Sequence, residues 1–249
     1  MANLFHEILY RPLFNALIFL YQYFSFHDLG IAIILLTIVI RLILFPLFYK
    51  GAKDQAIMQR LAPKIKEIQN NHKNDREKQA KALMDLYRQH RVSPFSGFLL
   101  LLIQLPILIA LYRVFLAGFS VEALNNLYSF ISKPEFLNHS FLGVIDLSKK
   151  SFLIIAAAAV IQYFQGKLSV VKTNKPFKDL TTTERMSRQM IYFGPILTII
   201  FLYFFNLPSA VALYWLTTSA FSVIQQIMIN KKISENFNGT TTRQVKKTD

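Results

Sequence analysis

The chain has 249 residues, of which 53% are hydrophobic, 14% aromatic and 17% charged, and its formal net charge is +14. The charged residues gather in blocks between long apolar runs, which is typical of an integral membrane protein and excludes an ordinary soluble domain. The absence of cysteine excludes disulfides, thiolate metal sites, cysteine nucleophiles and a lipidated N-terminal cysteine.

Residues 1–28 are aromatic and apolar but are interrupted by polar residues and a proline, namely Glu7, Arg11, Pro12, Asn15 and Gln22. A span here would need a reversal within His27-Asp28 before the next apolar run. We therefore predict an amphipathic helix on the extracytoplasmic interface rather than a sixth span. The opening residues lack the basic region and cleavage site of a secretory signal and the composition of a transit peptide, which favours a bacterial plasma membrane.

Residues 29–49 form the first predicted transmembrane span, and Arg41 is its only charged residue. An arginine inside a spanning helix costs about 2.5–3.5 kcal/mol on insertion scales, so it normally faces protein or water. The alternative is snorkelling, in which a long side chain lifts its charge to the interface. Lys50 lies nine residues further on, about 13 Å at a rise of about 1.5 Å per residue, which favours a polar cavity. Thr37 shares this helix face.

Residues 50–94 are predicted to form a cytoplasmic helical hairpin. Two apolar stripes at helical spacing flank a polar turn at residues 70–75; they comprise Ile57, Leu61, Ile65 and Ile68, then Ala80, Leu83, Met84 and Tyr87. Pro63 should kink the first arm or mark its restart. Eleven Lys and Arg against five acids leave this segment strongly positive. The alternative is a solvated basic loop, but the two stripes favour a hairpin that contacts headgroups or a partner.

Four further spans are predicted at residues 95–118, 151–167, 189–206 and 208–229, giving an all-α polytopic membrane protein with five transmembrane helices. Lys and Arg concentrate in the cytoplasmic hairpin, in the loop 168–188 and in the tail 230–249. Residues 1–28 hold one basic residue, and the loop 119–150 holds three against three acids. By the positive-inside rule, the N-terminus is then extracytoplasmic and the C-terminus cytoplasmic.

Several polar residues lie within the predicted spans. Gln104 precedes Pro106 in the second span, Gln162 and Gln165 end the third, and Tyr214 and Trp215 lie in the fifth with Thr217, Thr218 and Ser219. Taken singly, each is typical of ordinary hydrogen bonding between helices. However, no Asp or Glu lies within the spans to neutralise Arg41, so its positive charge is available to bind a ligand. Together these residues could line a hydrophilic groove.

Ordered motifs across residues 6–230 resemble the YidC family of membrane protein insertases. They are Gln104-Leu105-Pro106-Ile107 before Ala110-Leu111-Tyr112, Asn206-Leu207-Pro208-Ser209 before Ala212-Leu213-Tyr214-Trp215, Leu61-Ala62-Pro63-Lys64-Ile65, and the setting of Arg41. The chain resembles a short bacterial member without the large extracytoplasmic domain. It departs from many relatives in reading Gly97-Phe98-Leu99-Leu100 before the second span, and in lacking the lipoprotein signal of many short members.

The resemblance implies a membrane protein insertase that works without ATP. Five core helices would enclose a hydrophilic groove that is open to the cytoplasm and to lipid. Arg41 would be the groove charge, Thr37 its neighbour, and Tyr214 with Trp215 the aromatic part of the substrate-contacting wall. Gln104 belongs to the same predicted lining. Either Gln162 or Gln165 would supply the polar wall of the third helix, and the resemblance does not align which.

The main competing class is a secondary transporter or channel for a small anionic solute, but no internal repeat supports it. An enzyme is not expected, because all five histidines lie outside the predicted spans and no phosphate-binding loop exists. We predict no catalytic residue, metal or cofactor. The expected partners are nascent membrane proteins and the lipid bilayer. The Sec translocon is a further candidate partner. The basic tail could bind the ribosome or, alternatively, anionic lipid.

Overall fold

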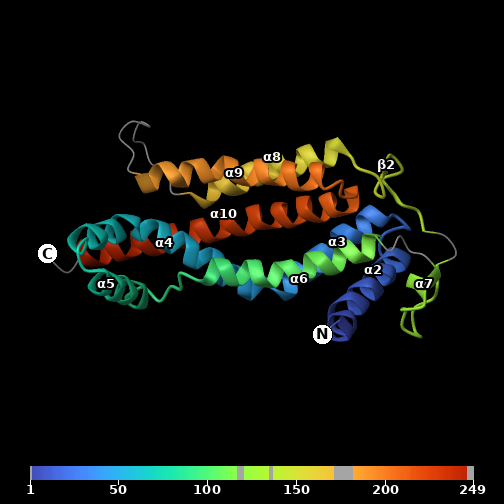
Figure 1. Ribbon diagram of the computed structural model, residues 1–249, viewed down its shortest axis with the longest axis horizontal. Helices are drawn as coiled ribbons and strands as arrows, with labels where there is room; N and C mark the ends of the chain where they lie inside the picture. The colour runs from blue at the N-terminus through green and yellow to red at the C-terminus, as the bar shows by residue number, and fades with distance from the viewer. Residues whose placement is uncertain (1, 117–120, 135–136, 171–181, 246–249) are drawn as a thin grey trace.

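The computed structural model of the chain describes residues 2–116, 121–134, 137–170 and 182–245. Figure 1 shows an elongated bundle with most helices along its long axis and α10 between an α8–α9 layer and a layer that holds α3 and α6. α10 packs against α8, α3, α4 and α6, so it is the central helix. The long helices are α3 (Leu29–Ile43), α6 (Ser96–Leu116), α8 (Phe152–Ser169), α9 (Thr182–Phe204) and α10 (Ser209–Val245).

The N-terminal arm consists of α1 (Ala2–Phe5), a π-helical turn η1 (His6–Tyr10) and α2 (Arg11–Tyr23). α2 buries one face against α3 and α6 and exposes Phe19 and Tyr23 on the other. The buried residues of that face are Phe14, Leu17, Ile18 and Tyr21, at the three- and four-residue spacing of a helix stripe. The arm is thus an amphipathic helix whose apolar face is part of the core of the bundle.

The first predicted span is not one continuous helix. Asp28 caps α3 by accepting a hydrogen bond from the Ile31 N–H at 2.9 Å, and α3 ends at Ile43. α4 (Phe45–Asn71) then leaves at an angle of 70°. Pro46 explains the break, because proline lacks the N–H that would continue the helix but fits the first turn of a new one. Residues 45–49 of the predicted span therefore belong to α4, because α3 ends at Ile43.

α4 and α5 (Arg76–Gln89) form the predicted helical hairpin. Its core contains the buried side chains of Leu61, Leu86 and Val92, packed against apolar residues that include Ile65 and Ile68. Asp75 caps α5 by accepting from the Lys78 N–H at 3.0 Å. α4 continues through Pro63, so the predicted restart at that residue does not occur. The whole first predicted stripe therefore faces the hairpin core, but of the second only Tyr87 does, because Leu86 takes the buried position while Ala80 and Met84 are exposed.

The loop 119–150 contains the short helix α7 (Val121–Leu124) and a two-stranded antiparallel sheet. β1 (Ser140–Phe141) pairs with β2 (Ile145–Asp146), with Ser140 opposite Asp146. The fold is therefore mostly helical but carries one small β-hairpin that the sequence analysis did not predict. Asp28 holds this hairpin on α3, because its second carboxylate oxygen accepts from the Leu142 N–H at 2.6 Å.

Asn15 ties the same loop to the N-terminal arm. Its side chain is buried, donates to the Asn126 carbonyl at 3.0 Å and accepts from the Tyr128 N–H at 2.6 Å. We expect Asn15→Ala to lower the free energy of unfolding by about 1–3 kcal/mol, because both backbone groups lose a buried partner. Thermal unfolding in detergent measures this, with Asn125→Ala, an exposed neighbour, as the control. An equal effect of the two substitutions would contradict the assigned role of Asn15.

Within the described ranges, two helices, α6 and α8, are long and apolar enough to cross a membrane, and α3 with α4 meets the same test as a bent pair. α9 contains a shorter apolar stretch, Ile191–Phe204. The predicted spans 189–206 and 208–229 overlap α9 and α10, but α10 continues to Val245 into the predicted tail. Residues 171–181 of the predicted cytoplasmic loop, and Lys246 and Lys247 of the tail, lie outside the described residues.

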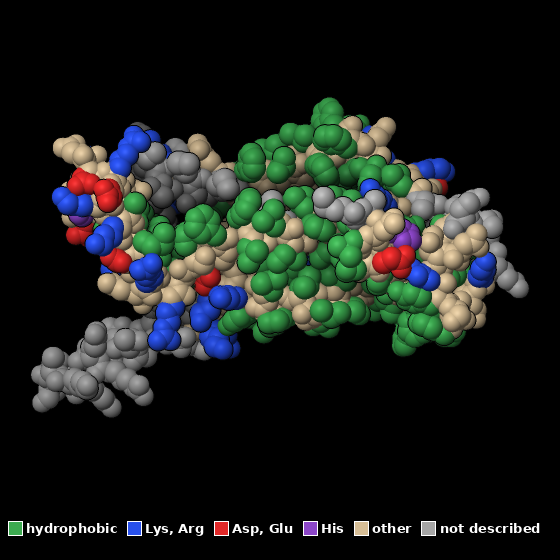
Figure 2. All heavy atoms as spheres, turned by 60° about the horizontal axis from the view of Figure 1, so that its bottom comes forward, with side chains coloured by type: hydrophobic (Ala, Val, Ile, Leu, Met, Phe, Trp, Pro, Cys, Tyr) green, Lys and Arg blue, Asp and Glu red, His purple; other side chains and the backbone are tan. Residues whose placement is uncertain are grey.

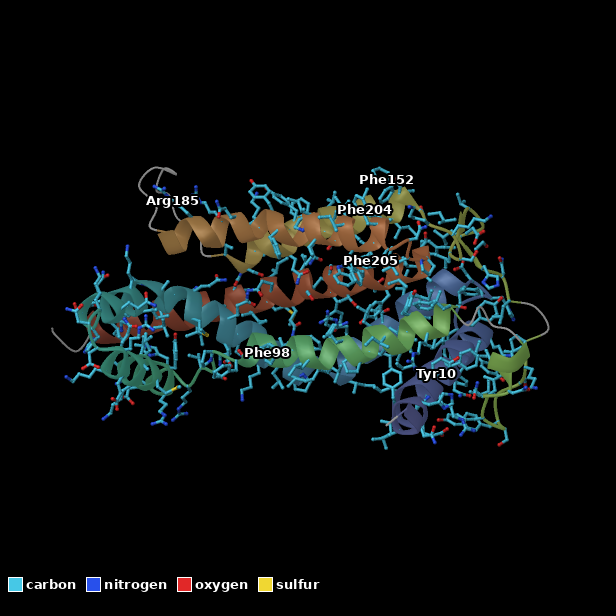
Figure 3. All side chains as sticks on the ribbon, in the orientation of Figure 1. Tyr10, Phe98, Phe152, Arg185, Phe204 and Phe205 are labelled. Carbon is cyan, nitrogen blue, oxygen red and sulfur yellow. The ribbon has the colours of Figure 1, made fainter. Side chains whose placement is uncertain are left out.

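The surface of the bundle is divided along its length. Figure 2 shows hydrophobic side chains over the middle of one face, with Lys, Arg, Asp and Glu gathered at the end that holds α4 and α5 and fewer at the opposite end. Figure 3 places Phe152 and Phe204 at one end of the α8–α9 pair and Arg185 at the other. This division into an apolar middle and charged ends is typical of a protein that crosses a bilayer.

Candidate functional site

α3 carries Arg41 into the interior of the bundle. Only 6% of Arg41 is exposed, although it lies in the last turn of α3. Its guanidinium carbon lies 4.3 Å from the centroid of the Phe48 ring on α4. Among the described residues, the structure gives the guanidinium no carboxylate partner. A buried and unneutralised charge of this kind favours a site for an anionic ligand over a side chain that snorkels to the interface.

Thr37 lies one turn before Arg41 and is fully buried. Its hydroxyl donates a hydrogen bond to the Ile33 carbonyl at 2.6 Å, which is a common partner for a threonine hydroxyl in a helix. Thr37 therefore shares the helix face of Arg41 as predicted from the spacing, but its proton is already used within its own helix.

Gln104 and Tyr214 join α6 to α10. The Gln104 side-chain amide donates to the Tyr214 hydroxyl, and Tyr214 is only 3% exposed. Tyr214 also lies close enough to Arg41 for the two side chains to interact electrostatically. Thr218 lies beside the same hydroxyl, yet within the described part of the chain its own Oγ1 has no partner at hydrogen-bonding geometry. Gln104 and Tyr214 thus meet across two helices, and Arg41 on a third helix lies within electrostatic range of Tyr214.

Gln162, rather than Gln165, faces the aromatic residues of α10. The Gln162 Oε1 accepts from the Trp215 indole N–H at 3.3 Å and from the Ser219 hydroxyl at 2.7 Å. Gly194 on α9 makes room for it, because a Cβ there would lie 3.2 Å from the Gln162 Cγ. The structure therefore separates two residues that the sequence could not distinguish. We call Arg41, Gln104, Gln162, Tyr214, Trp215 and Ser219 the polar cluster.

The polar residues of α10 extend further than predicted. They recur at every fourth position, namely Tyr214, Thr218, Ser222, Gln226 and Asn230, and because a helix has about 3.6 residues per turn this stripe winds around α10 instead of staying on one face. Gln226 donates to the Asn230 Oδ1 at 3.0 Å, and Asn230 donates to the Leu168 carbonyl on α8 at 2.8 Å. The neighbouring Gln225 is 3% exposed. Only the first part of this stripe was predicted, although the four-residue spacing was visible in the sequence.

An apolar pocket of about 230 Å³ lies where α6, α9 and α10 meet, and Phe201 of its lining packs against Trp215 of the polar cluster with the ring centroids 5.7 Å apart. Its lining residues include Tyr112 on α6, Phe205 beyond the end of α9, and Val211 on α10. The described residues contain no group of three or more acids, histidines or cysteines that could hold a metal ion. The arrangement therefore offers hydrogen bonding, one positive charge and apolar surfaces to a ligand.

These features define a helical membrane protein with a polar cluster buried among apolar helices. The model of the family described as "60Kd inner membrane protein" matches residues 19–236. The proteins named membrane protein insertase YidC are 32% identical in Geobacter metallireducens, 34% in Wolinella succinogenes and 31% in Chlamydia trachomatis. The alignments cover 91%, 90% and 93% of this chain but 38%, 37% and 29% of the relatives.

The chain therefore belongs to the 60Kd inner membrane protein family, which includes the YidC membrane protein insertases. This confirms the resemblance drawn from its ordered motifs. The chain spans less than two fifths of the length of these curated relatives. The family description agrees with the predicted membrane location, and the names of the relatives agree with the prediction that the chain is not an enzyme.

Proposed function

We propose that the chain is a membrane protein insertase. It moves the hydrophilic tails of nascent membrane proteins across the bilayer without ATP and releases their transmembrane segments into lipid. The observation that carries this proposal is the buried Arg41, which lies within electrostatic range of Tyr214 and has no carboxylate partner among the described residues. Family membership supports the same conclusion, because the matching relatives are named insertases.

The physical problem of insertion is the polar tail. Each unpaired polar group of the tail costs several kcal/mol in hydrocarbon, so a tail that crosses lipid directly meets a high barrier. We propose that the polar cluster and the stripe along α10 form a hydrophilic groove that replaces water for these groups over part of the path. Arg41 then attracts acidic tail residues, and a membrane potential that is positive outside adds about 2.3 kcal/mol per charge per 100 mV.

The transmembrane segment of the substrate supplies the driving force for release. It gains roughly 25 cal/mol for each Å² of apolar surface that leaves water. The apolar pocket at α6, α9 and α10, and the exposed hydrophobic side chains of α6 and α9, provide a surface along which such a segment can leave. No chemical change in the substrate is required, which agrees with a site that contains hydrogen-bond donors and acceptors and one charge.

The proposed topology has five spans, with the N-terminal arm on the extracytoplasmic interface. The chain has no native cysteine, so single cysteines give a direct test. We expect Asn3→Cys to react with an impermeant maleimide from outside and Lys232→Cys only after the membrane is opened, since both positions are exposed in the structure. Labelling of both from the same side of the membrane would rule out the five-span arrangement.

Reconstitution tests the function itself. Liposomes that contain only this protein should make a small, acid-tailed membrane protein protease-protected without ATP, and empty liposomes should not. Flux of a small anion through the same liposomes, without substrate insertion, would instead support the transporter or channel. Matched samples with added Sec translocon or ribosomes test whether either proposed partner raises the yield of inserted substrate.

A further inference from the structure

The contact between Arg41 and Phe48 depends on the break between α3 and α4. The two residues are seven positions apart, which is about 10.5 Å along a straight helix at a rise of about 1.5 Å per residue. The 70° bend at the break folds the first turn of α4 toward α3. The Phe48 ring centroid consequently lies 4.3 Å from the guanidinium carbon.

An aromatic ring holds a guanidinium differently from a carboxylate. A carboxylate takes the N–H edge, neutralises the charge and uses the donors. A ring that interacts with the face of the guanidinium restrains its position but leaves both the charge and the N–H donors in place. Within the described part of the chain, Phe48 is the ring recorded over Arg41, and no acceptor is recorded for its N–H groups. This arrangement suits a side chain that must be held in place and still bind an anion.

We propose that Phe48 is a positioning residue that determines how strongly the site prefers acidic tails. It holds the Arg41 guanidinium in place inside the bundle, with its N–H donors free for a substrate carboxylate. The inference rests on the proposed insertase function and adds a specificity-determining residue to it. Loss of the ring should let the guanidinium adopt other rotamers and weaken the binding of acidic residues, while tails without acids should be little affected.

A matched control is available on the same turn of α4. Phe45 is also half-buried, but its ring contacts Tyr49 at 5.7 Å and Phe221 on α10 at 6.4 Å instead of Arg41. Phe45→Leu therefore removes an equal volume from the same region without touching the guanidinium. A purely structural role of this turn would give Phe45→Leu and Phe48→Leu the same phenotype.

The experiment measures protease-protected insertion of one substrate, with zero, one or two acids in its tail, into liposomes that contain each variant. We expect Phe48→Leu to reduce insertion of the two-acid tail by about fivefold and to leave the acid-free tail nearly unchanged, as loss of a cation–π contact would do. Phe48→Tyr, which keeps the ring, should restore the preference for acidic tails. Phe45→Leu should affect all tails equally.

Arg41→Ala in the same series separates this inference from the proposed function. Suppose that Arg41→Ala selectively impairs insertion of acidic tails. If Phe48→Leu then impairs every tail alike, or Phe48→Tyr does not restore the preference for acidic tails, Phe48 has no positioning role, and the insertase proposal still stands. If Arg41→Ala changes the insertion of all tails to the same extent, the role of the arginine charge is rejected. The proposed positioning of that charge by Phe48 is then rejected as well. Adding Phe48→Leu to Arg41→Ala should cause no further loss for acidic tails.

Discussion

Arg41→Ala is expected to reduce insertion of substrates with acidic tails by at least about tenfold, because hydrogen bonds to charged groups contribute about 1.5–3 kcal/mol. Tails without acids should lose much less. Arg41→Lys should keep part of the activity, since it retains the charge but not the planar set of donors. Arg41→Glu should be worst for acidic tails, because like charges then meet in a buried site. The measurement is insertion of one substrate with zero, one or two tail acids.

The outcomes of this series are distinct. An equal loss for every tail would mean that Arg41 holds the fold, and loss of the unfolding transition in detergent would show this directly. No loss for any tail would mean that the charge has no part in insertion. Gln162→Leu provides a comparison within the polar cluster, because it removes the acceptor of Trp215 and Ser219 but no charge. It should weaken insertion without discriminating among the tails.

The hairpin is the second place where a large effect is expected. Leu86 is buried in the hairpin core, whereas Met84, two residues earlier on α5, is 44% exposed. Leu86→Asp should separate the arms, since loss of a buried leucine alone costs about 2–5 kcal/mol. Met84→Asp should stay within about 0.5 kcal/mol of the parent, as surface changes usually do. Limited proteolysis of the protein in membranes would detect the opened hairpin.

Function of the hairpin is tested with the same two variants. If the folded hairpin guides the substrate, Leu86→Asp should lower insertion and Met84→Asp should not, and deletion of residues 56–90 should lower it further. Full activity after this deletion would show that the segment is only a charged loop. The contact of Ala56 with Ile229 on α10 makes deletion more disruptive than the point substitution, so the point variants carry the interpretation.

The sequence by itself determined the helical membrane class, the family and the hairpin, and it singled out Arg41 as a candidate site residue. These features depend on local information: the length of apolar runs, three- and four-residue spacing, and the cost of a charge in hydrocarbon. The hairpin is an example, because two apolar stripes flanking a polar turn predict it, although Leu86 of its core was not among the predicted residues. The motifs around Gln104 and Tyr214 were equally visible in the sequence, whereas the contact between them was not.

Only the tertiary structure decided which polar residues meet. Gln162 and Gln165 are three residues apart and similar in sequence context, yet the rotation of α8 against α10 brings only Gln162 to Trp215 and Ser219. The break before Pro46 likewise placed Phe48 against Arg41, and the β-hairpin between α7 and α8 arose from strand pairing and from its attachment to Asp28. Helix rotation, bend angle and loop packing result from contacts between distant segments, and periodicity in one segment does not contain that information.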